Sequence, residues 1–245
     1  MIDIVYLWRV VMDPILLTGV ICLAIGTYLY GSVCWAIIIV RIKLHQDIRL
    51  LGDGNPGAHN TSRTLGGKLG LLVMILDSTK GFIPAIIAST VNFKEYQSWV
   101  IGLVGTCSIL GHCFPIFFQF RGGNGISTLF GFMIVFNSWM VLEWGIFVFV
   151  LTLIFKYIKP IQFISTALTS ALGFIIKWKF YWNNYFPMLV PDSTMIAVPL
   201  MVLLVSLIQF PRFIPHFYRA FKGTDEKTFL LSPIFKHRKV SIENE

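Results

Sequence analysis

Long apolar runs are the feature that most constrains how this chain can fold. The first of them, residues 14–40, exceeds the roughly 20 residues that a helix needs to cross a bilayer. The runs are continuously apolar and lack the alternation that transmembrane strands show. With 56% hydrophobic and 13% charged residues and a mean hydropathy of +0.73, the chain is not an ordinary water-soluble domain. We therefore expect an all-α integral membrane protein.

We expect one membrane domain over residues 1–245, built as a bundle of seven transmembrane helices. The first run is too long for the core of a signal peptide and is expected to be retained. Only Glu143 divides the fourth span from the fifth, and residues 156–160 divide the fifth from the sixth, so five or six spans remain alternatives. The predicted spans are residues 14–40, 68–91, 97–120, 126–142, 144–158, 161–176 and 188–210, followed by a basic tail at 211–245.

The basic residues predict an outside N-terminus and an inside C-terminus, because cytoplasmic loops carry an excess of Lys and Arg. The inner side then receives most of the chain's 20 Lys and Arg residues. The outer side receives Arg9, Lys94, Lys177 and Lys179. Contact of the basic face with anionic lipid headgroups accounts for the net charge of +8 without a nucleic-acid partner.

A glycine-rich pentad, Arg121-Gly122-Gly123-Asn124-Gly125, lies between two apolar runs on the predicted cytoplasmic side. Glycines let backbone amides approach a ligand closely, and a turn that leads into a helix directs unpaired N–H groups and the positive helix end to one point. Such an arrangement binds phosphate, and an arginine can add charge-assisted hydrogen bonds. The pentad alone leaves a second interpretation equally open, namely a tight turn whose glycines permit close helix packing.

A second loop rich in glycine and asparagine, residues 47–63, is predicted on the same side of the membrane. Asn and Gly tolerate unusual backbone angles, so turn formation is one interpretation of this loop. Two such loops that face each other favour a phosphate-binding site more than either loop does alone. The residues that we expect to bind phosphate here are Arg49, Asn55, Gly57 and Asn60, with Arg63 at the end of the loop.

Three ionisable residues fall within the predicted spans near these loops. Asp77 and Lys80 are three residues apart, so they share a helix face and can neutralise each other. Such residues are often functional, but we interpret the pair as structural support for the site. His112 lies shortly before the pentad, where binding of substrate and a role as a core histidine are both open. The four cysteines show no metal-site spacing, and we expect no metal and no cofactor.

These segments together resemble the PlsY family, the bacterial membrane glycerol-3-phosphate acyltransferases that use acyl phosphate as donor. The resemblance covers nearly the whole chain and is strongest through residue 128. The segments that carry it are GS at 31–32, DIRLLGDGNPGAHNTSRTLGGKLGLLVMILDSTKGFIPA at 47–85, SWVIGLVGTCSILGHCFPIFFQFRGGNGIST at 98–128 and RAFKGTD at 219–225.

The resemblance implies a seven-helix bundle in the bacterial cell membrane, with an outside N-terminus and three signature regions on the cytoplasmic face. The implied reaction is acyl transfer from acyl phosphate to the 1-hydroxyl of glycerol 3-phosphate, which gives lysophosphatidate and phosphate. The implied partners are these two substrates and the lipid bilayer, with no obligate protein partner.

The chain departs from the family's usual signatures at several positions. Asp53 replaces a hydroxyl residue of the first signature, and Asn124 replaces the second cation of the pentad. In the third signature Phe213 replaces a histidine and His216 an asparagine, and Asp225 replaces a glutamate. A carboxylate at position 53 would repel a phosphate unless Arg49, Arg63 or a new histidine compensates it.

We hypothesise that an acyl phosphate, which is already activated, needs an enzyme mainly to align the alcohol and to stabilise the departing phosphate. The amides of Gly122, Gly123 and Gly125 with Arg121 would hold one phosphate. Arg63 and Arg49 would hold the other. His59 or His216 would assist the hydroxyl as a general base. The predicted catalytic residues are Arg63, His59, His216 and Asp53. The residues predicted to bind substrate are Arg49, Asn55, Gly57, Asn60, His112, Arg121, Gly122, Gly123, Asn124 and Gly125.

Two other interpretations remain open at this point. The chain could be a catalytically degenerate paralogue that binds or regulates, because several signature positions are altered. It could also be a small-solute transporter, although its polar residues gather on one face and do not form a path across the membrane. An acyltransferase of the HxxxxD type is disfavoured, because no histidine has an aspartate five positions later.

Overall fold

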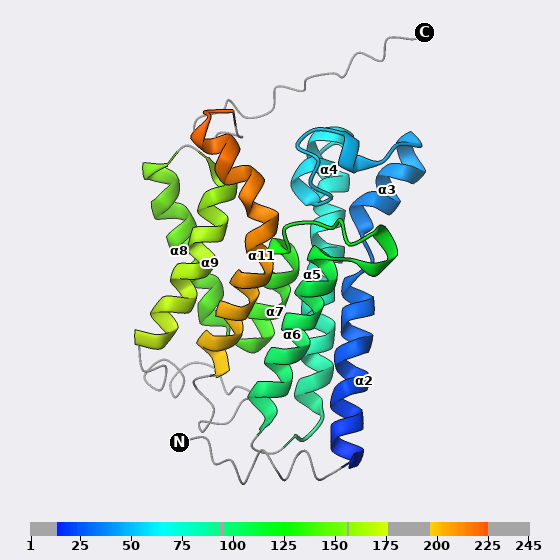
Figure 1. Cartoon of the computed structure of the whole chain (residues 1–245), viewed down its shortest axis with the longest axis vertical. Helices are drawn as coiled ribbons and strands as arrows, with labels where there is room; N and C mark the ends of the chain where they lie inside the picture. The colour runs from blue at the N-terminus through cyan, green and yellow to red at the C-terminus, as the bar shows by residue number, and fades with distance from the viewer. Residues whose placement is uncertain (1–13, 94–95, 156, 176–196, 225–245) are drawn as a thin grey trace.

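The computed structural model describes residues 14–93, 96–155, 157–175 and 197–224, and within these ranges its regular elements are helices. Figure 1 shows the longer helices running side by side as one bundle, with short helices at one end. The longer helices are α2 (Pro14–Gly31), α5 (Gly67–Thr90), α6 (Gln97–Cys113), α7 (Ile126–Phe136), α8 (Ser138–Ile154), α9 (Ile158–Ile175) and α11 (Ala197–Phe221). The short elements are α3 (Trp35–Leu44), η1 (Ile48–Leu50), α4 (Ala58–Leu65) and η3 (Ile116–Phe118).

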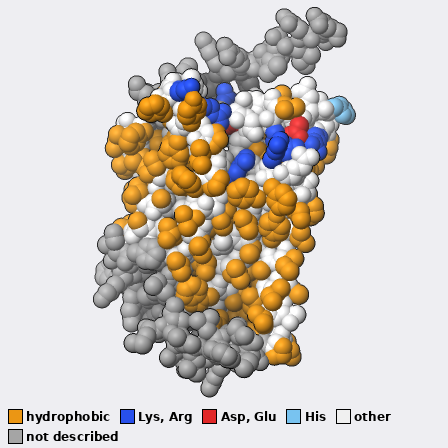
Figure 2. Space-filling model, in the orientation of Figure 1, with side chains coloured by type: hydrophobic (Ala, Val, Ile, Leu, Met, Phe, Trp, Pro, Cys, Tyr) orange, Lys and Arg blue, Asp and Glu red, His pale blue; other side chains and the backbone are white. Residues whose placement is uncertain are grey.

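Four helical segments of the described chain are long and apolar enough to cross a membrane. They are Pro14–Leu44, Gly67–Thr90, Gln97–Phe118 and Leu200–Phe221, and the apolar helices α7 and α8 are shorter. Figure 2 shows hydrophobic side chains over most of the visible face, whereas Lys, Arg and acidic side chains gather toward the end where α3 and α4 lie. The predicted class, an all-α membrane protein, is confirmed.

Several predicted boundaries differ from the structure. The fourth and fifth predicted spans meet at Asn137 and not at Glu143, because Asn137 caps α8 by accepting a hydrogen bond from the amide of Trp139. Residues 211–221 continue α11 past two prolines and are therefore helix, not tail. Residues 1–13, 188–196 and 225–245, which include parts of the last predicted span and of the tail, lie outside the described residues.

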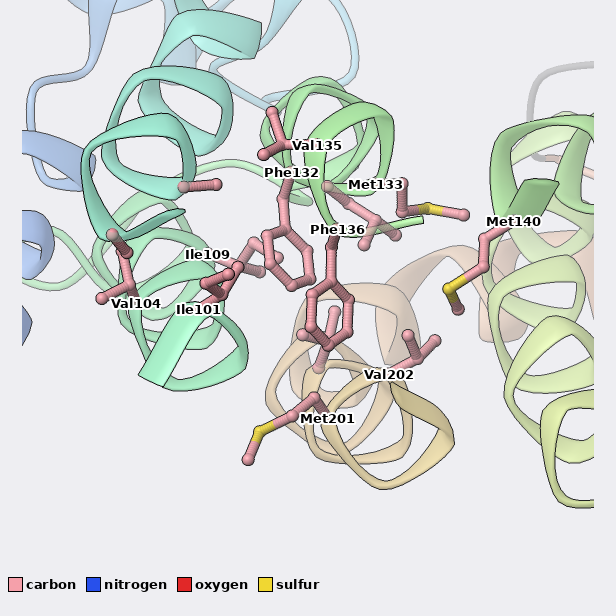
Figure 3. Packing of buried hydrophobic residues seen from close by; sticks show 14 of the residues in the cluster. Ile101, Val104, Ile109, Phe132, Met133, Val135, Phe136, Met140, Met201 and Val202 are labelled. Atoms are coloured by element: carbon pink, nitrogen blue, oxygen red, sulfur yellow. The ribbon is translucent and has the colours of Figure 1, made fainter. Parts of the chain in front are cut away.

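Helix α7 lies at the centre of the hydrophobic core. Its Phe132 and Phe136 rings stack with centroids 4.8 Å apart. Figure 3 shows both rings between residues of α6, such as Val104, and residues of α11, such as Met201 and Val202. With 11 residues, α7 is only roughly 16 Å long, about half the thickness of a bilayer core. Its first turn therefore starts within the bundle, and Figure 1 shows the preceding connection below α3 and α4.

Pairs of glycines let neighbouring helices approach each other closely. A Cβ on Gly131 of α7 would overlap the main chain of Ser78 in α5, and a Cβ on Gly81 of α5 would overlap the main chain of Thr128 in α7. Gly31 and Gly111 form an equivalent contact between α2 and α6. These small residues set the helix separation, as is common where lipid provides no hydrophobic drive for association.

Substitution of Gly131 by Ala is expected to lower the free energy of unfolding by about 2–3 kcal/mol, because the methyl group must push α5 and α7 apart. The matched control is Gly145→Ala in α8, where an added Cβ meets nothing within 4 Å. That control should be neutral or stabilising by up to about 1 kcal/mol, since Ala favours helix. Thermal unfolding of both purified variants measures the difference, and equal stabilities would contradict the close-contact interpretation.

Candidate functional site

A cavity of about 530 Å³ lies where both predicted signature loops meet the helix bundle. Its wall combines polar groups from the loops with apolar side chains from the helices, so it can hold a ligand that has both a polar and an apolar part. The lining residues are Asn55, Gly57, Ala58, His59, Ser62, Gly70, Leu71, Met74, Asp77, Ser78, His112, Asn124, Gly125, Ile126, Ser127, Phe130, Trp144, Lys159 and Gln162.

A buried cluster of three ionisable residues forms part of this wall. The Lys80 ammonium lies 2.7 Å from Asp77 Oδ1 and donates to His112 Nδ1 at 3.3 Å. All three side chains are almost fully buried. The structure thus places Asp77 and Lys80 together as the sequence predicted, and it adds His112 to the pair.

The pentad is held to the end of α6 by its own backbone. The amide of Gly122 donates to the Cys113 carbonyl at 3.2 Å, and the amide of Gly123 donates to the His112 carbonyl at 3.1 Å. A Cβ on Gly122 would overlap the carbonyl of His112, and a Cβ on Gly123 would overlap the imidazole ring of His112. The predicted role of these two amides in holding phosphate is therefore corrected, because both already donate to α6.

The next residues of the pentad do face the cavity. Gly125 is the N-cap of α7 with φ of 79°, a left-handed conformation that favours glycine, and it supplies no side-chain cap to the helix. Ile126 and Ser127 of the first turn line the cavity. Within the described residues the buried side-chain amide of Asn124 has no hydrogen-bond partner for its Nδ2 atom. Together they direct donor groups and a helix N-terminus at the cavity, an arrangement that suits an anion.

The rear of the pentad is fixed by α11. The Gln209 side chain donates to the Asn124 carbonyl at 3.0 Å, and Arg212 donates to the Gly122 carbonyl. Helix α11 is itself held to α9, because the ring of Phe163 packs against Phe213 with centroids 5.4 Å apart. Phe213, a departure from the family's signature, is thus a core residue.

Two asparagines of the first loop have different surroundings. The Asn60 side chain is buried and donates to the carbonyls of Leu51 at 2.8 Å and Ile48 at 3.3 Å. Asn60 therefore closes the loop and does not line the cavity. Asn55 lines the cavity, and within the described residues its buried Oδ1 atom has no hydrogen-bond partner. Gly57, which also lines the cavity, precedes α4 as its N-cap.

Asp53 faces a cation that the sequence interpretation did not assign to the site. Its Oδ1 atom accepts a hydrogen bond from the Asn55 amide, and its Oδ2 atom lies 3.5 Å from the Lys159 ammonium. The charge of Asp53 is thus compensated from α9, by a residue outside the predicted set of Arg49, Arg63 and a histidine. In the predicted topology Lys159 lies in a basic connection between two spans. The one sequence feature that indicates otherwise is Pro160, because proline directly after Lys159 is typical of the first turn of a helix.

Arg49 connects the two signature loops without lining the cavity. Its guanidinium forms a fork with both carboxylate oxygens of Asp47, at 2.8 and 3.0 Å, and donates to the Phe118 carbonyl at 3.0 Å. These hydrogen bonds hold the pKa of Asp47 well below its usual range. Arg49 therefore positions the connection that leads into the pentad, in contrast to the direct phosphate contact that was predicted.

Other predicted residues lie outside the cavity wall. Arg63 and Arg121 are exposed and do not line the cavity. His216 is buried in α11, where Arg219 donates to its Nδ1 atom at 3.4 Å, and it does not line the cavity either. Of the two histidines that were considered as a base, the structure brings His59 to the cavity.

His59 lies at the cavity wall with part of its side chain exposed. Removal from water at the wall, followed by repulsion from Lys159, lowers the pKa of His59 to about 4, and Asp53 opposes the shift. Solvent at the exposed part of the ring screens these effects, but their direction leaves the imidazole neutral at pH 7. A neutral imidazole can accept a proton.

In the described part of the chain, no group of three His, Cys, Asp or Glu residues could hold a metal ion.

Comparison with known proteins gives consistent matches. The family model described as Glycerol-3-phosphate acyltransferase matches residues 21–223. A glycerol-3-phosphate acyltransferase of Aquifex aeolicus is 47% identical over 109 residues, which are 44% of this chain and 55% of the relative. One of Mycoplasma capricolum is 34% identical over 169 residues, or 68% of this chain and 64% of the relative. The chain thus matches between about half and two thirds of the length of these two relatives.

Two solved structures share the fold over most of the chain. The crystal structure of PlsY (YgiH), an integral membrane glycerol 3-phosphate acyltransferase, matches in its glycerol 3-phosphate form with a TM-score of 0.71 and 30% identity. The match covers 86% of this chain and 96% of PlsY. The lysophosphatidic acid form of the same protein matches with a TM-score of 0.68 and 29% identity.

Removal of one partner of the buried ion pair is expected to destabilise the fold strongly. Lys80→Met and Asp77→Asn should each lower the free energy of unfolding by about 3 kcal/mol, because each change leaves or creates an uncompensated buried group. The double variant should recover part of this loss. The control is Arg41→Met, which removes an exposed ion pair with Asp47 and should cost less than about 1 kcal/mol. Additive effects of the two single changes would contradict a coupled pair.

Proposed function

We propose that this chain, which belongs to the glycerol-3-phosphate acyltransferase family, transfers an acyl group from acyl phosphate to the 1-hydroxyl of glycerol 3-phosphate. The products are lysophosphatidate and phosphate, as in the synthesis of phospholipids. The observation that carries the proposal is the cavity, because residues from both signature loops and apolar residues of α5, α7 and α8 line one space. Both proposed substrates carry phosphate, and the donor also carries a long apolar chain.

The proposed topology counts α2 with α3, α5, α6, α7, α8, α9 and α11 as the seven membrane-associated segments of one domain. The N-terminus lies outside and the C-terminus inside, so the cavity opens at the cytoplasmic face of a bacterial cell membrane. The basic residues that gather at the α4 end of the bundle support this orientation. The activity is proposed to need no protein partner.

In the proposed reaction, the hydroxyl oxygen of glycerol 3-phosphate attacks the acyl carbon. A new C–O ester bond forms, the bond between the acyl carbon and the phosphate oxygen breaks, and phosphate leaves. Because the donor is already activated, alignment of the two substrates supplies most of the rate increase. The first turn of α7 and the amide of Asn124 face the departing phosphate and stabilise its charge. No covalent intermediate with the protein is required.

The remaining predicted residues take supporting roles in this proposal. His59 accepts the proton of the attacking hydroxyl. Asn55 and Gly57 shape the wall beside His59. The exposed cations Arg63 and Arg121 raise the local concentration of phosphate-bearing substrates at the membrane surface, since they lie outside the cavity wall.

The proposed activity is tested by incubating purified protein with palmitoyl phosphate and glycerol 3-phosphate and by measuring phosphate and lysophosphatidate. Equal amounts of both products are expected. Asn124→Asp should lower kcat/KM roughly 100-fold, because a carboxylate of the same size would repel phosphate in a partly dehydrated site. Asn92→Asp, the same change at an exposed residue that does not line the cavity, should have little effect.

Lack of product with glycerol 3-phosphate, from protein that unfolds cooperatively on heating, would overturn the proposed reaction. A panel of other polyol phosphates then separates two cases. Product with another acceptor would indicate an acyltransferase of different specificity, whereas no product with any acceptor would favour a catalytically degenerate paralogue.

The role of His59 is tested by the pH dependence of kcat. His59→Gln is expected to lower kcat roughly 100-fold at pH 7, the size of effect typical of a general base. In the wild type, kcat should fall only as the pH drops toward about 4, because protonation of His59 removes the base and the pKa of His59 is lowered to about 4. His45→Gln, a change at an exposed histidine outside the cavity wall, serves as the control. An acid limb that is unchanged in His59→Gln would belong to the substrate phosphate and would exclude His59 as the base.

A further inference from the structure

Lys159 occupies an unusual position for a lysine. It lies in the first turn of α9 and its side chain is 5% exposed. Among the lining residues in the described part of the chain, it is the one that carries a Lys or Arg side chain. Lys80, the buried lysine of α5, pairs with Asp77 and does not line the cavity. Lys159 is therefore the cation that a ligand in the cavity meets.

Local structure does not account for a buried lysine at this point. The N-terminus of a helix carries a partial positive charge, so a cation in the first turn is unfavourable. Removal of an ammonium group from water is unfavourable as well. Residues that break local rules in this way are expected at functional sites. Helix α9 is held to α11 by Phe163, one turn after Lys159, so the backbone that carries the lysine is fixed.

The ion pair of Lys159 is looser than the other buried pair. Lys159 Nζ lies 3.5 Å from Asp53 Oδ2, whereas Lys80 Nζ lies 2.7 Å from Asp77 Oδ1. Charge-assisted hydrogen bonds between nitrogen and oxygen are typically about 2.7–2.9 Å long. The carboxylate of Asp53 thus balances the charge of the ammonium at a separation longer than that of a charge-assisted hydrogen bond.

The groups around Lys159 fit a phosphate. Gln162, three residues later on the same helix, also lines the cavity, and so do Asn124 and the first turn of α7. Asn124 brings a buried Nδ2 donor that has no hydrogen-bond partner among the residues that the structure describes. An ammonium, an amide donor and a helix N-terminus are groups that bind a phosphate oxygen. Their chemistry does not select between the phosphate of a polyol phosphate and that of an acyl phosphate.

We propose that the Lys159 ammonium binds the phosphate group of a substrate in the cavity and that Asp53 is the counterion that positions it. The proposal rests on the proposed function only for the identity of the substrate. Asp53 and the phosphate of the ligand then compete for the positive charge of Lys159. Asp53 holds the ammonium in place when the cavity is empty, and its negative charge opposes the arrival of the phosphate.

The charges of the two residues provide the test. Binding of glycerol 3-phosphate, of inorganic phosphate and of a non-transferable acyl phosphonate is measured by calorimetry on purified protein. Lys159→Met should raise the Kd of the ligand whose phosphate it binds at least 10-fold, equal to about 1.4 kcal/mol. Lys159→Arg should retain most of the affinity. Asp53→Asn, which keeps the Oδ1 acceptor for Asn55, should leave the Kd unchanged or lower it severalfold.

The control is Lys43→Met, which removes an exposed lysine outside the cavity wall and should not change the Kd. Unchanged binding by Lys159→Met would overturn the proposal. Equal weakening by Lys159→Met and Asp53→Asn would overturn it too, because the pair would then be only a structural salt bridge. Absence of binding by the wild type has the same consequence. Binding that depends on Lys159, from a protein that forms no lysophosphatidate, would support Lys159 and reject the proposed acyl transfer.

Discussion

The buried ion pair between Lys80 and Asp77 is the interaction on which the arrangement of the site depends. Both side chains are almost fully buried, and His112 of α6 contacts the same ammonium. The carbonyls of the two α5 residues also accept hydrogen bonds, from Ser108 of α6 and from Thr128 of α7. Three helices are thus fixed to one another at the level of the cavity. Apolar packing alone is not directional and would not specify this alignment.

The two interpretations of the glycine pentad both describe part of the structure. Gly122 and Gly123 serve close packing, since their amides donate to the end of α6 and a Cβ at either position would overlap His112. Gly125 and Asn124 instead face the cavity at the start of α7. The first two glycines set the path of the chain, and this path determines where the helix N-terminus points. A short α7 is necessary as well, because it allows its first turn to lie inside the bundle.

Sequence patterns predicted the features that depend on local chemistry. The span at 68–91 corresponds to α5 at Gly67–Thr90, because apolar runs lie on both sides of Asp77 and Lys80, and these two charges pair on one face of the helix. The break before α8 was misplaced at Glu143. A charge near a membrane segment was interpreted as a boundary, whereas the capping side chain of Asn137 defines it. The exposed positions of Arg63 and Arg121 could not be predicted, because a residue type near a loop does not determine the direction of its side chain.

By itself, the sequence determined that this chain is an all-helical membrane protein with its basic groups gathered at one end and with two polar loops able to meet there. Hydrophobic runs and charge counts are sufficient for this, because the bilayer imposes the same requirement on every segment. Only the tertiary structure decided which residues share the cavity. Lys159 lies more than 100 residues from Asp53 along the chain, and the packing of α9 against α11 brings its charge to the carboxylate. Contacts of this kind depend on helix position and rotation, which no local pattern encodes.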